Sequence, residues 1–381
     1  MKNVRTVVTV LAAAALLAAG SGLFACKKKE PETIKIGAIL PLTGDAANYG
    51  QSGKKGIEIA LKHYKEDRGA EAKKIEVIYE DDKAEPKDGV SAYKKLVEMD
   101  RVVGVIGPMP SSVTLAVAPY TNDEKVPILS PASSAPKITE AGKYVFRNYP
   151  SDTFEGKVLA EFAFNKLGYT KAAIIHANTE YGVGLADYYT QTFKKAGGVL
   201  VQTETYQQGE TDFRTQLLKI KKAAPEVLLI VGHIEEIVRL LKQKDELGVK
   251  TPVLGPVSFN DPKLSGLPKE ITEGIIFSTP TYDPKNTTDE RVVRFVSDFK
   301  AEFNAEPDIW AGLAYDAAAI YFATVDNEEE VSAERVTNDL TEIKDFPGVT
   351  GLTSFDENGD VEKKVDLYVV KEGEFVKYGS I

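Results

Sequence analysis

Strand-like and helix-like segments alternate along this chain, and the alternation runs twice. Short apolar segments rich in β-branched residues, beginning with Ile34–Leu40, are each followed by a longer amphipathic segment, beginning with residues 49–66. The rhythm starts again after Pro150. Strands of this second run are predicted at residues 172–176, 199–203 and 227–231. Because strand, helix and strand in succession imply a parallel sheet covered by helices, we predict an α/β fold with two doubly wound parallel-sheet units.

The length of the chain agrees with two units, since 381 residues are more than a single domain with one hydrophobic core usually contains. After the second unit, helices are predicted near residues 291–303 and 310–323. Short strands follow Pro347, and the turn residues at 356–360 indicate a hairpin.

The first residues are typical of an export signal. Lys2 and Arg5 precede an apolar run from Val7 to Ala19, which as a helix would span about 20 Å, less than the roughly 30 Å hydrocarbon core. We therefore predict a signal peptide over residues 1–25. No other stretch of the sequence is long and apolar enough to cross a bilayer.

Cys26 is the only cysteine of the chain, and the residues Leu23-Phe24-Ala25 before it resemble the lipobox of bacterial lipoproteins. This resemblance implies lipid attachment at Cys26, with residues 26–32 as a charged tether and the folded part exported to a periplasm or cell surface. The alternative is ordinary cleavage after Ala25, which would leave a free thiol in an oxidising compartment.

Several function classes find little support in the composition. A net charge of −10 argues against nucleic acid as a partner. The histidines His63, His176 and His233 lie far apart and no cysteine accompanies them, so no metal site is expected. No nucleophile elbow, phosphate loop or dinucleotide motif is present, so we expect neither an enzyme nor a cofactor.

Two loops at predicted carboxyl ends of strands are rich in proline and small hydroxyl residues. They cover residues 108–112 and 130–136. In doubly wound sheets this edge is where ligands bind. Ser111 is placed as the N-cap of the following helix, where its hydroxyl and free backbone N–H groups could hold a carboxylate. Plain helix capping and turn formation would also explain either loop alone.

Taken together, the motifs resemble those of leucine/isoleucine/valine-type periplasmic binding proteins, from about residue 33 to the C-terminus. They are Gly37-Ala38-Ile39-Leu40-Pro41-Leu42-Thr43-Gly44, Tyr49-Gly50, Gly107-Pro108 with Ser111-Ser112, Val126-Pro127, residues 132–136 and Tyr181-Gly182. The resemblance implies a monomer of two lobes joined by three crossovers, which closes around its ligand and delivers it to an ABC transporter permease. The lobes would comprise residues 33–149 with 283–346, and residues 150–282 with 347–381.

The resemblance also implies site residues. Ser111 and the loop formed by Ala132, Ser133 and Ser134 would hold the ligand carboxylate, and Ser134 would also reach an amine. Tyr49 and Tyr181 would cover the ligand from opposite lobes, and Asp152 matches an acidic position that some relatives direct at the cleft. These residues make an amino acid, especially a branched-chain or other apolar one, the expected ligand.

This chain departs from the family pattern at two positions. Val257 stands where relatives often carry a carboxylate for the ligand ammonium, and His233 stands where an aromatic residue often follows the strand. A buried ammonium without a paired anion is costly, by several kcal/mol or so. Either Asp152 takes over, or the ligand is an aliphatic or aromatic carboxylate without an amine. A sensor that reports ligand to a signalling partner is the alternative to a transport receptor.

Overall fold

A computed structural model describes residues 33–282, 284–285 and 287–380 of the chain. The predicted signal peptide and the predicted lipid attachment at Cys26 lie outside these residues. Within the described part, no helix has the length and apolar character needed to span a bilayer. Two large β-sheets organise the chain, and each is the centre of one lobe.

The first sheet consists of five parallel strands in the order β2-β1-β3-β4-β5. These strands are β1 (Ile34–Leu40), β2 (Ile75–Asp81), β3 (Val105–Ile106), β4 (Ile128–Ser130) and β5 (Val145–Arg147). Every β1 residue from position 36 to 40 is buried, as expected for a strand covered on both faces. β3 is the shortest strand of this sheet, with only Val105 and Ile106, and Arg101 before it has a left-handed backbone conformation.

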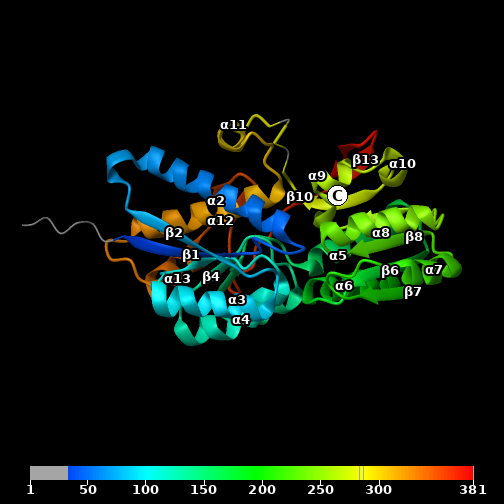
Figure 1. The fold of residues 1–381 in the computed structure, drawn as a ribbon, viewed down its shortest axis with the longest axis horizontal. Coiled ribbons are helices and arrows are strands. Elements are labelled where there is room, and N and C mark those ends of the chain that lie inside the picture. The colour runs from blue at the N-terminus through cyan, green and yellow to red at the C-terminus, as the bar shows by residue number, and fades with distance from the viewer. Residues whose placement is uncertain (1–32, 283, 286, 381) are drawn as a thin grey trace, which may run out of the picture. The chain divides into compact units, whose positions relative to one another are not determined.

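Helices cover both faces of the first sheet (Figure 1). They are α2 (Ala47–Arg68), α3 (Pro86–Lys94), α4 (Ser111–Glu124), α11 (Glu290–Phe303), α12 (Ile309–Asn327) and α13 (Ala333–Glu342). Successive β1 side chains serve opposite faces: Ala38 packs in the core of α2 and α12, and Ile39 in the core of α3 and α4. Because α12 and α11 both pack against α2, helices from late in the sequence complete the first lobe.

The second sheet has seven strands in the order β14-β13-β10-β9-β8-β6-β7. They are β6 (Lys171–Ala177), β7 (Val199–Tyr206), β8 (Val227–Val231), β9 (Val253–Gly255), β10 (Ile276–Pro280), β13 (Val365–Lys371) and β14 (Glu374–Ser380). The strands from β7 to β10 are parallel, and β13 and β14 add an antiparallel edge. The fold class predicted from the alternation is therefore confirmed, with one antiparallel addition.

Four helices cover the second sheet: α5 (Asp152–Glu161), α6 (Glu180–Lys195), α7 (Arg214–Ala223) and α8 (Ile234–Glu246). In β8 the side chain of Leu229 packs with the α5 and α6 side, whereas Leu228 packs with the α7 and α8 side. The smaller elements of the two lobes are η1 (Gly69–Glu71), η2 (Lys95–Asp100), η3 (Pro136–Glu140), η4 (Phe162–Lys166), η5 (Val257–Phe259), α9 (Pro262–Ser265) and α10 (Lys269–Thr272).

A two-stranded ribbon of β11 (Phe346–Gly348) and β12 (Gly351–Thr353) follows the last helix. The buried carboxylate of Asp316, on α12, accepts hydrogen bonds from the backbone N–H groups of Val349 and Thr350 over 2.6 and 2.9 Å. These bonds attach the ribbon to the first lobe.

The predicted hairpin at residues 356–360 is a turn closed by one bridge between Phe355 and Val361. Asp360 in this turn pairs with the fully buried Arg147 of β5, with both oxygens 2.6 Å from guanidinium nitrogens. We therefore assign residues 346–361 to the first lobe, whereas the sequence expectation placed 347–381 in the second.

Candidate ligand-binding site

A cavity of about 50 Å³ lies between the two lobes. Most of the predicted site residues line it, namely Tyr49, Ser111, Ala132 and Ser134 from the first lobe and Tyr181, His233 and Val257 from the second. The sequence analysis did not single out the remaining lining residues as ligand contacts: Pro41, Met109, Pro110, Ser258 and Trp310. Ser133 and Asp152 lie close by but do not line the cavity.

The first-lobe wall of the cavity comes from loops at the carboxyl ends of the parallel strands. Pro41 follows β1, Met109 follows β3, and Ala132 follows β4. Parallel strands bring such loops together at one edge of the sheet. The turn after β3 requires Gly107, which has a φ of 100° and where a Cβ atom would lie 2.1 Å from the Ile39 carbonyl oxygen.

Ser111 joins two of these loops. Its Oγ accepts hydrogen bonds from the backbone N–H groups of Ser134 and Ala135 over 3.1 and 3.2 Å. The prediction that Ser111 caps α4 is wrong, because Pro110 occupies the N-cap position and α4 begins at Ser111. Its hydroxyl points instead to the neighbouring loop, where it is the acceptor for the backbone N–H groups of Ser134 and Ala135.

Buried hydrogen bonds hold the loop after β4 in place. Ser133 Oγ lies 2.7 Å from Thr114 Oγ1 and donates to the Met109 carbonyl oxygen over 2.8 Å. One guanidinium nitrogen of Arg147 donates to the carbonyl oxygens of Ser134 and Ala135 over 3.1 and 3.0 Å. The predicted residue Ser133 therefore contributes to the support of the loop, and the loop geometry is held on both its N–H and its carbonyl sides.

Asp152 is the first residue of α5 and is completely buried. Its backbone N–H donates to the Ser134 carbonyl oxygen over 2.8 Å, but neither carboxylate oxygen has a partner of hydrogen-bond geometry among the described residues. Burial raises the pKa of Asp152 well above its usual range, and Glu155 adds to the rise, while the nearby Ser134 hydroxyl and Arg147 oppose it. Asp152 is therefore a buried acidic group whose carboxyl oxygens lack a positively charged hydrogen-bond partner among the described residues.

Glu155 lies one turn further along α5, and the sequence analysis did not identify it. Its Oε1 accepts hydrogen bonds from Val257 N–H and Ser278 Oγ over 3.0 and 2.6 Å, and its Oε2 accepts one from the Tyr149 hydroxyl over 3.2 Å. Burial raises the pKa of Glu155 to about 7. Position 257 itself carries no carboxylate, but the Glu155 carboxylate lies next to it and binds the Val257 backbone N–H.

Aromatic side chains from both lobes close the cavity. The Tyr49 ring lies 4.7 Å from the Trp310 ring and 5.6 Å from the His233 ring, measured between centroids. The Tyr181 ring is stacked on the His233 ring with centroids 6.4 Å apart. Trp310 is the only tryptophan of the chain and lies in the first turn of the apolar helix α12. No local signal in the sequence indicates its role, because Trp310 is far in sequence from the loops that it joins at the cavity.

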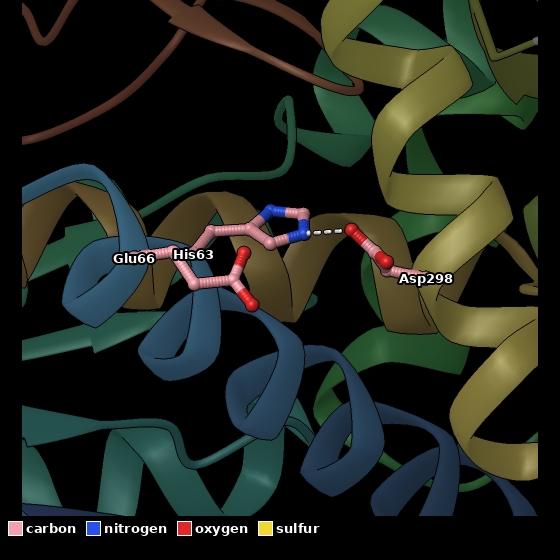
Figure 2. Close-up of side chains that lie close together, drawn as sticks. All are labelled: His63, Glu66 and Asp298. Carbon is pink, nitrogen blue, oxygen red and sulfur yellow. Dashed lines mark hydrogen bonds and ion pairs between the residues drawn. The ribbon is translucent and has the colours of Figure 1, made fainter.

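A separate group of potential metal ligands lies on α2 and α11, away from the cavity. Figure 2 shows His63 and Glu66 projecting from α2 toward Asp298 on α11. His63 Nε2 lies 2.9 Å from Asp298 Oδ2, and His63 Nδ1 lies 2.9 Å from the Tyr315 hydroxyl. Glu66 pairs with Arg294 over 2.9 Å. Because both ring nitrogens and one carboxylate already have partners, we interpret the group as a polar contact between two helices.

The family-model comparison assigns residues 33–374 to the model described as periplasmic binding protein. The chain belongs to the periplasmic binding protein family. Its fold is the type I fold of that family, which confirms the resemblance inferred from the motifs. The family description and the names of the relatives are those of periplasmic and solute-binding proteins.

Individual relatives cover nearly the whole chain. The leucine-, isoleucine-, valine-, threonine-, and alanine-binding protein of Pseudomonas aeruginosa is 29% identical over 89% of this chain and 90% of its own length. The branched-chain amino acid transporter substrate binding protein LivJ of Streptococcus pneumoniae, solved with isoleucine, is 27% identical with a TM-score of 0.83, covering 91% of this chain and 100% of that one. An ABC transporter solute binding protein of R. palustris, solved with benzoate, is 19% identical with a TM-score of 0.83, covering 92% and 96%. At that identity the last comparison shows the fold alone.

Proposed function

We propose that this protein captures a small carboxylate ligand, a branched-chain or other apolar amino acid, by lobe closure and delivers it to the permease of an ABC transporter. The observation that carries the proposal is the cavity between the lobes, which joins the hydroxyl-rich loops of one lobe to aromatic covers from both. The names of the relatives that cover nearly the whole chain support the same ligand class.

The ligand carboxylate is held by dipoles. Ser111 Oγ already accepts two N–H groups, so its own O–H proton is free to donate, and the two bonds polarise that proton toward an anion. Ser134 supplies a second hydroxyl at the same wall, and the N-terminus of α4 adds a favourable field. An anion buried here gains charge-assisted hydrogen bonds without a cationic side chain.

The ligand amine is balanced by Asp152. This carboxylate is buried beside Ser134 and its oxygens lack partners, so an ammonium group near Ser134 supplies the missing positive charge. The acidic group thus lies on the crossover helix α5, while the residue at the usual loop position is Val257. The rival ligand class is a carboxylate without an amine, and such a ligand would leave the buried Asp152 carboxylate without a positively charged partner.

The ligand side chain contacts apolar groups. Tyr49, Met109 and Trp310 contribute from the first lobe and Val257 from the second. Burying an aliphatic chain of three or four carbons against such a wall contributes about 2–3 kcal/mol. This term favours leucine, isoleucine or valine over glycine or charged amino acids.

A thermal-shift screen of the purified protein tests the proposal. The panel contains the twenty amino acids together with small aliphatic and aromatic acids, including benzoate. Because a ligand that binds the folded state raises the unfolding temperature with concentration, branched-chain amino acids should give the largest shifts. Shifts produced only by acids without an amine would favour the rival ligand class, and chemical turnover of a bound ligand would revive an enzymatic role.

The membrane anchor is a separate proposal. We propose that lipid on Cys26 keeps the exported trap beside its permease, and the lipobox-like residues before the cysteine support it. A Cys26→Ala precursor should appear in the soluble fraction, whereas the unchanged chain should sediment with membranes. Membrane association of processed Cys26→Ala protein would remove the anchor and leave the ligand proposal intact.

A further inference from the structure

The first turn of α6 in the second lobe lies against the first lobe, next to the ligand cavity. The backbone N–H of Glu180 donates to Ser112 Oγ over 3.3 Å, and the Glu180 carboxylate pairs with Lys137 over 2.9 Å. Ser112 is on α4 and Lys137 is on η3. Gly184 follows Glu180 by four positions and therefore lies on the same face of α6.

No side chain fits at Gly184 in this arrangement. A Cβ atom there would lie 2.5 Å from Pro136 Cδ and 3.4 Å from Pro136 Cγ. The nearest atoms around that Cβ position, outside the helix itself, all belong to Pro136. Because the ring is closed onto the backbone, it cannot rotate aside as a flexible side chain would. The conflict is therefore between the lobes.

The segment that carries Pro136 is also fixed. The N–H of Ala135 donates to Ser111 Oγ over 3.2 Å, and its carbonyl oxygen accepts from Arg147 Nη1 over 3.0 Å. Arg147 is fully buried and is held in turn by Asp360. Because both polar groups of Ala135 are bound, a side chain at position 184 would displace α6 and leave the Pro136 loop in place.

The fold of the second lobe gives no reason of its own for glycine at position 184. Glycine is among the least favourable residues inside a helix. Gly182, two residues earlier, is explained within that lobe, because a Cβ there would lie 2.1 Å from the Ala177 carbonyl oxygen. At Gly184 the three nearest atoms all belong to Pro136, at 2.5 to 3.8 Å, so outside the adjacent residues and the helix backbone no atom of its own lobe approaches that Cβ position more closely.

We propose that Gly184 is a positioning residue for ligand capture, because its bare backbone lets α6 seat on Pro136 and bring the second lobe onto the loop that holds Ser134. The inference rests on the proposed function, since lobe closure is the step that the seat permits. A side chain at position 184 holds the lobes apart and lowers the closed fraction. The apparent ligand affinity falls in proportion to that fraction.

The test measures the distance between the lobes in the full chain. Nitroxide labels are placed at Lys87→Cys in the first lobe and Lys222→Cys in the second, two exposed positions, in a Cys26→Ser background. Pulsed electron paramagnetic resonance then gives the distance distribution without ligand and with L-leucine. The variants are Gly184→Ala, Pro136→Ala and the double variant, with Gly182→Ala as the comparison for a glycine required within one lobe.

We expect the labelled protein with Gly184 and Pro136 unchanged to show a population with a short distance between the labels. Gly184→Ala should lose this population almost completely. The double variant should regain it, because alanine at position 136 lacks the ring carbons that meet the new Cβ. Gly184→Ala should keep or raise the unfolding temperature, whereas Gly182→Ala should lower it. Unchanged distances in Gly184→Ala, or no recovery in the double variant, would overturn the proposal.

The two proposals fail in different ways. If leucine and the acids of the panel leave the distances in the label background unchanged, the proposed ligand class is wrong, and the comparison of ligand-free variants still decides the role of Gly184. If the labelled protein with Gly184 and Pro136 unchanged shows no short-distance population, with or without ligand, the contact between α6 and Pro136 does not form in solution and the proposal is wrong.

Discussion

The backbone N–H of Ile234 donates to the Tyr49 hydroxyl over 2.6 Å and so joins the second lobe to the first at the edge of the ligand cavity. Ile234 is the first residue of α8, where a backbone N–H has no partner within the helix. The other lobe supplies that partner. A residue predicted to cover the ligand therefore also holds the closed arrangement.

Tyr49→Phe should weaken leucine binding by about fivefold to a hundredfold, since it leaves the Ile234 N–H buried and unpaired in the closed state. The ring contact with Trp310 remains, so the unfolding temperature should change little. Tyr64→Phe is the matched control, because the Tyr64 hydroxyl binds Asp326 within the first lobe. Calorimetric titration of both variants checks this, and equal affinity of Tyr49→Phe and the unchanged protein would contradict it.

Asp152→Asn should weaken the binding of leucine by about tenfold or more, because it removes the charge opposite the ligand ammonium and keeps the side-chain shape. The comparison ligand is 4-methylpentanoic acid, which is leucine without its amine. Its affinity should stay the same or improve in the variant. If both ligands lose affinity equally, Asp152 acts on the loop geometry and the assignment of the amine is wrong.

The sequence was informative where a residue type had a local physical reason. Apolar alternation located the sheets, and small hydroxyl residues after buried strands located the wall with Ser111 and Ser134. Partners distant in sequence were not accessible in this way. Glu155 reads as an ordinary helix residue until Val257 and Ser278 are brought to its carboxylate. Trp310 likewise becomes a cavity residue only when α12 packs beside α2.

The same limit explains the two expectations that differ from the structure. Serine is a common N-cap residue, but the Ser111 hydroxyl accepts hydrogen bonds from the N–H groups of Ser134 and Ala135, which belong to another loop. The lobe ranges that the family resemblance implied placed residues 347–381 in the second lobe, and nothing local in the sequence marks Asp316 and Arg147 as partners of the segment after residue 346. Tertiary hydrogen bonds decided both cases, to the Ser111 hydroxyl in the first and to the buried charges of Asp316 and Arg147 in the second.

Glu155 should make the stability of the protein depend on pH. Its pKa is about 7 in the folded protein, above the ordinary value of 4.5, because of burial. The folded state therefore binds more protons than the unfolded state between these values, and the free energy of unfolding falls as pH rises through this window, by up to about 3 kcal/mol. Urea unfolding of the unchanged protein and of Glu155→Gln at pH 5, 6, 7 and 8 measures the difference. Parallel curves would show that Glu155 does not titrate in this range.

Asp261 should make ligand affinity depend on pH. It accepts a hydrogen bond from Asn48 of the first lobe over 2.7 Å, and burial together with the charge of Asp308 raises its pKa to about 6. Opening removes the first lobe from Asp261, so closure takes up protons and affinity should rise as pH falls from 7 to 5.

Asp261→Asn should flatten this dependence, because asparagine cannot ionise and still caps α9. Calorimetric titrations with leucine at several pH values compare the two proteins. Other carboxylates contribute equally to both curves, so the difference isolates Asp261. A variant with the same pH profile as the unchanged protein would exclude this residue as the proton acceptor.

Whether the cavity captures an amino acid is decided by calorimetric titration of the purified protein with L-leucine, beside 4-methylpentanoic acid and benzoate. We predict saturable binding of one leucine per chain, with weaker binding of both acids that lack an amine. Saturable binding of an acid with no heat from leucine would contradict the amino acid assignment, and the absence of saturable binding for the whole series would contradict ligand capture by this cavity.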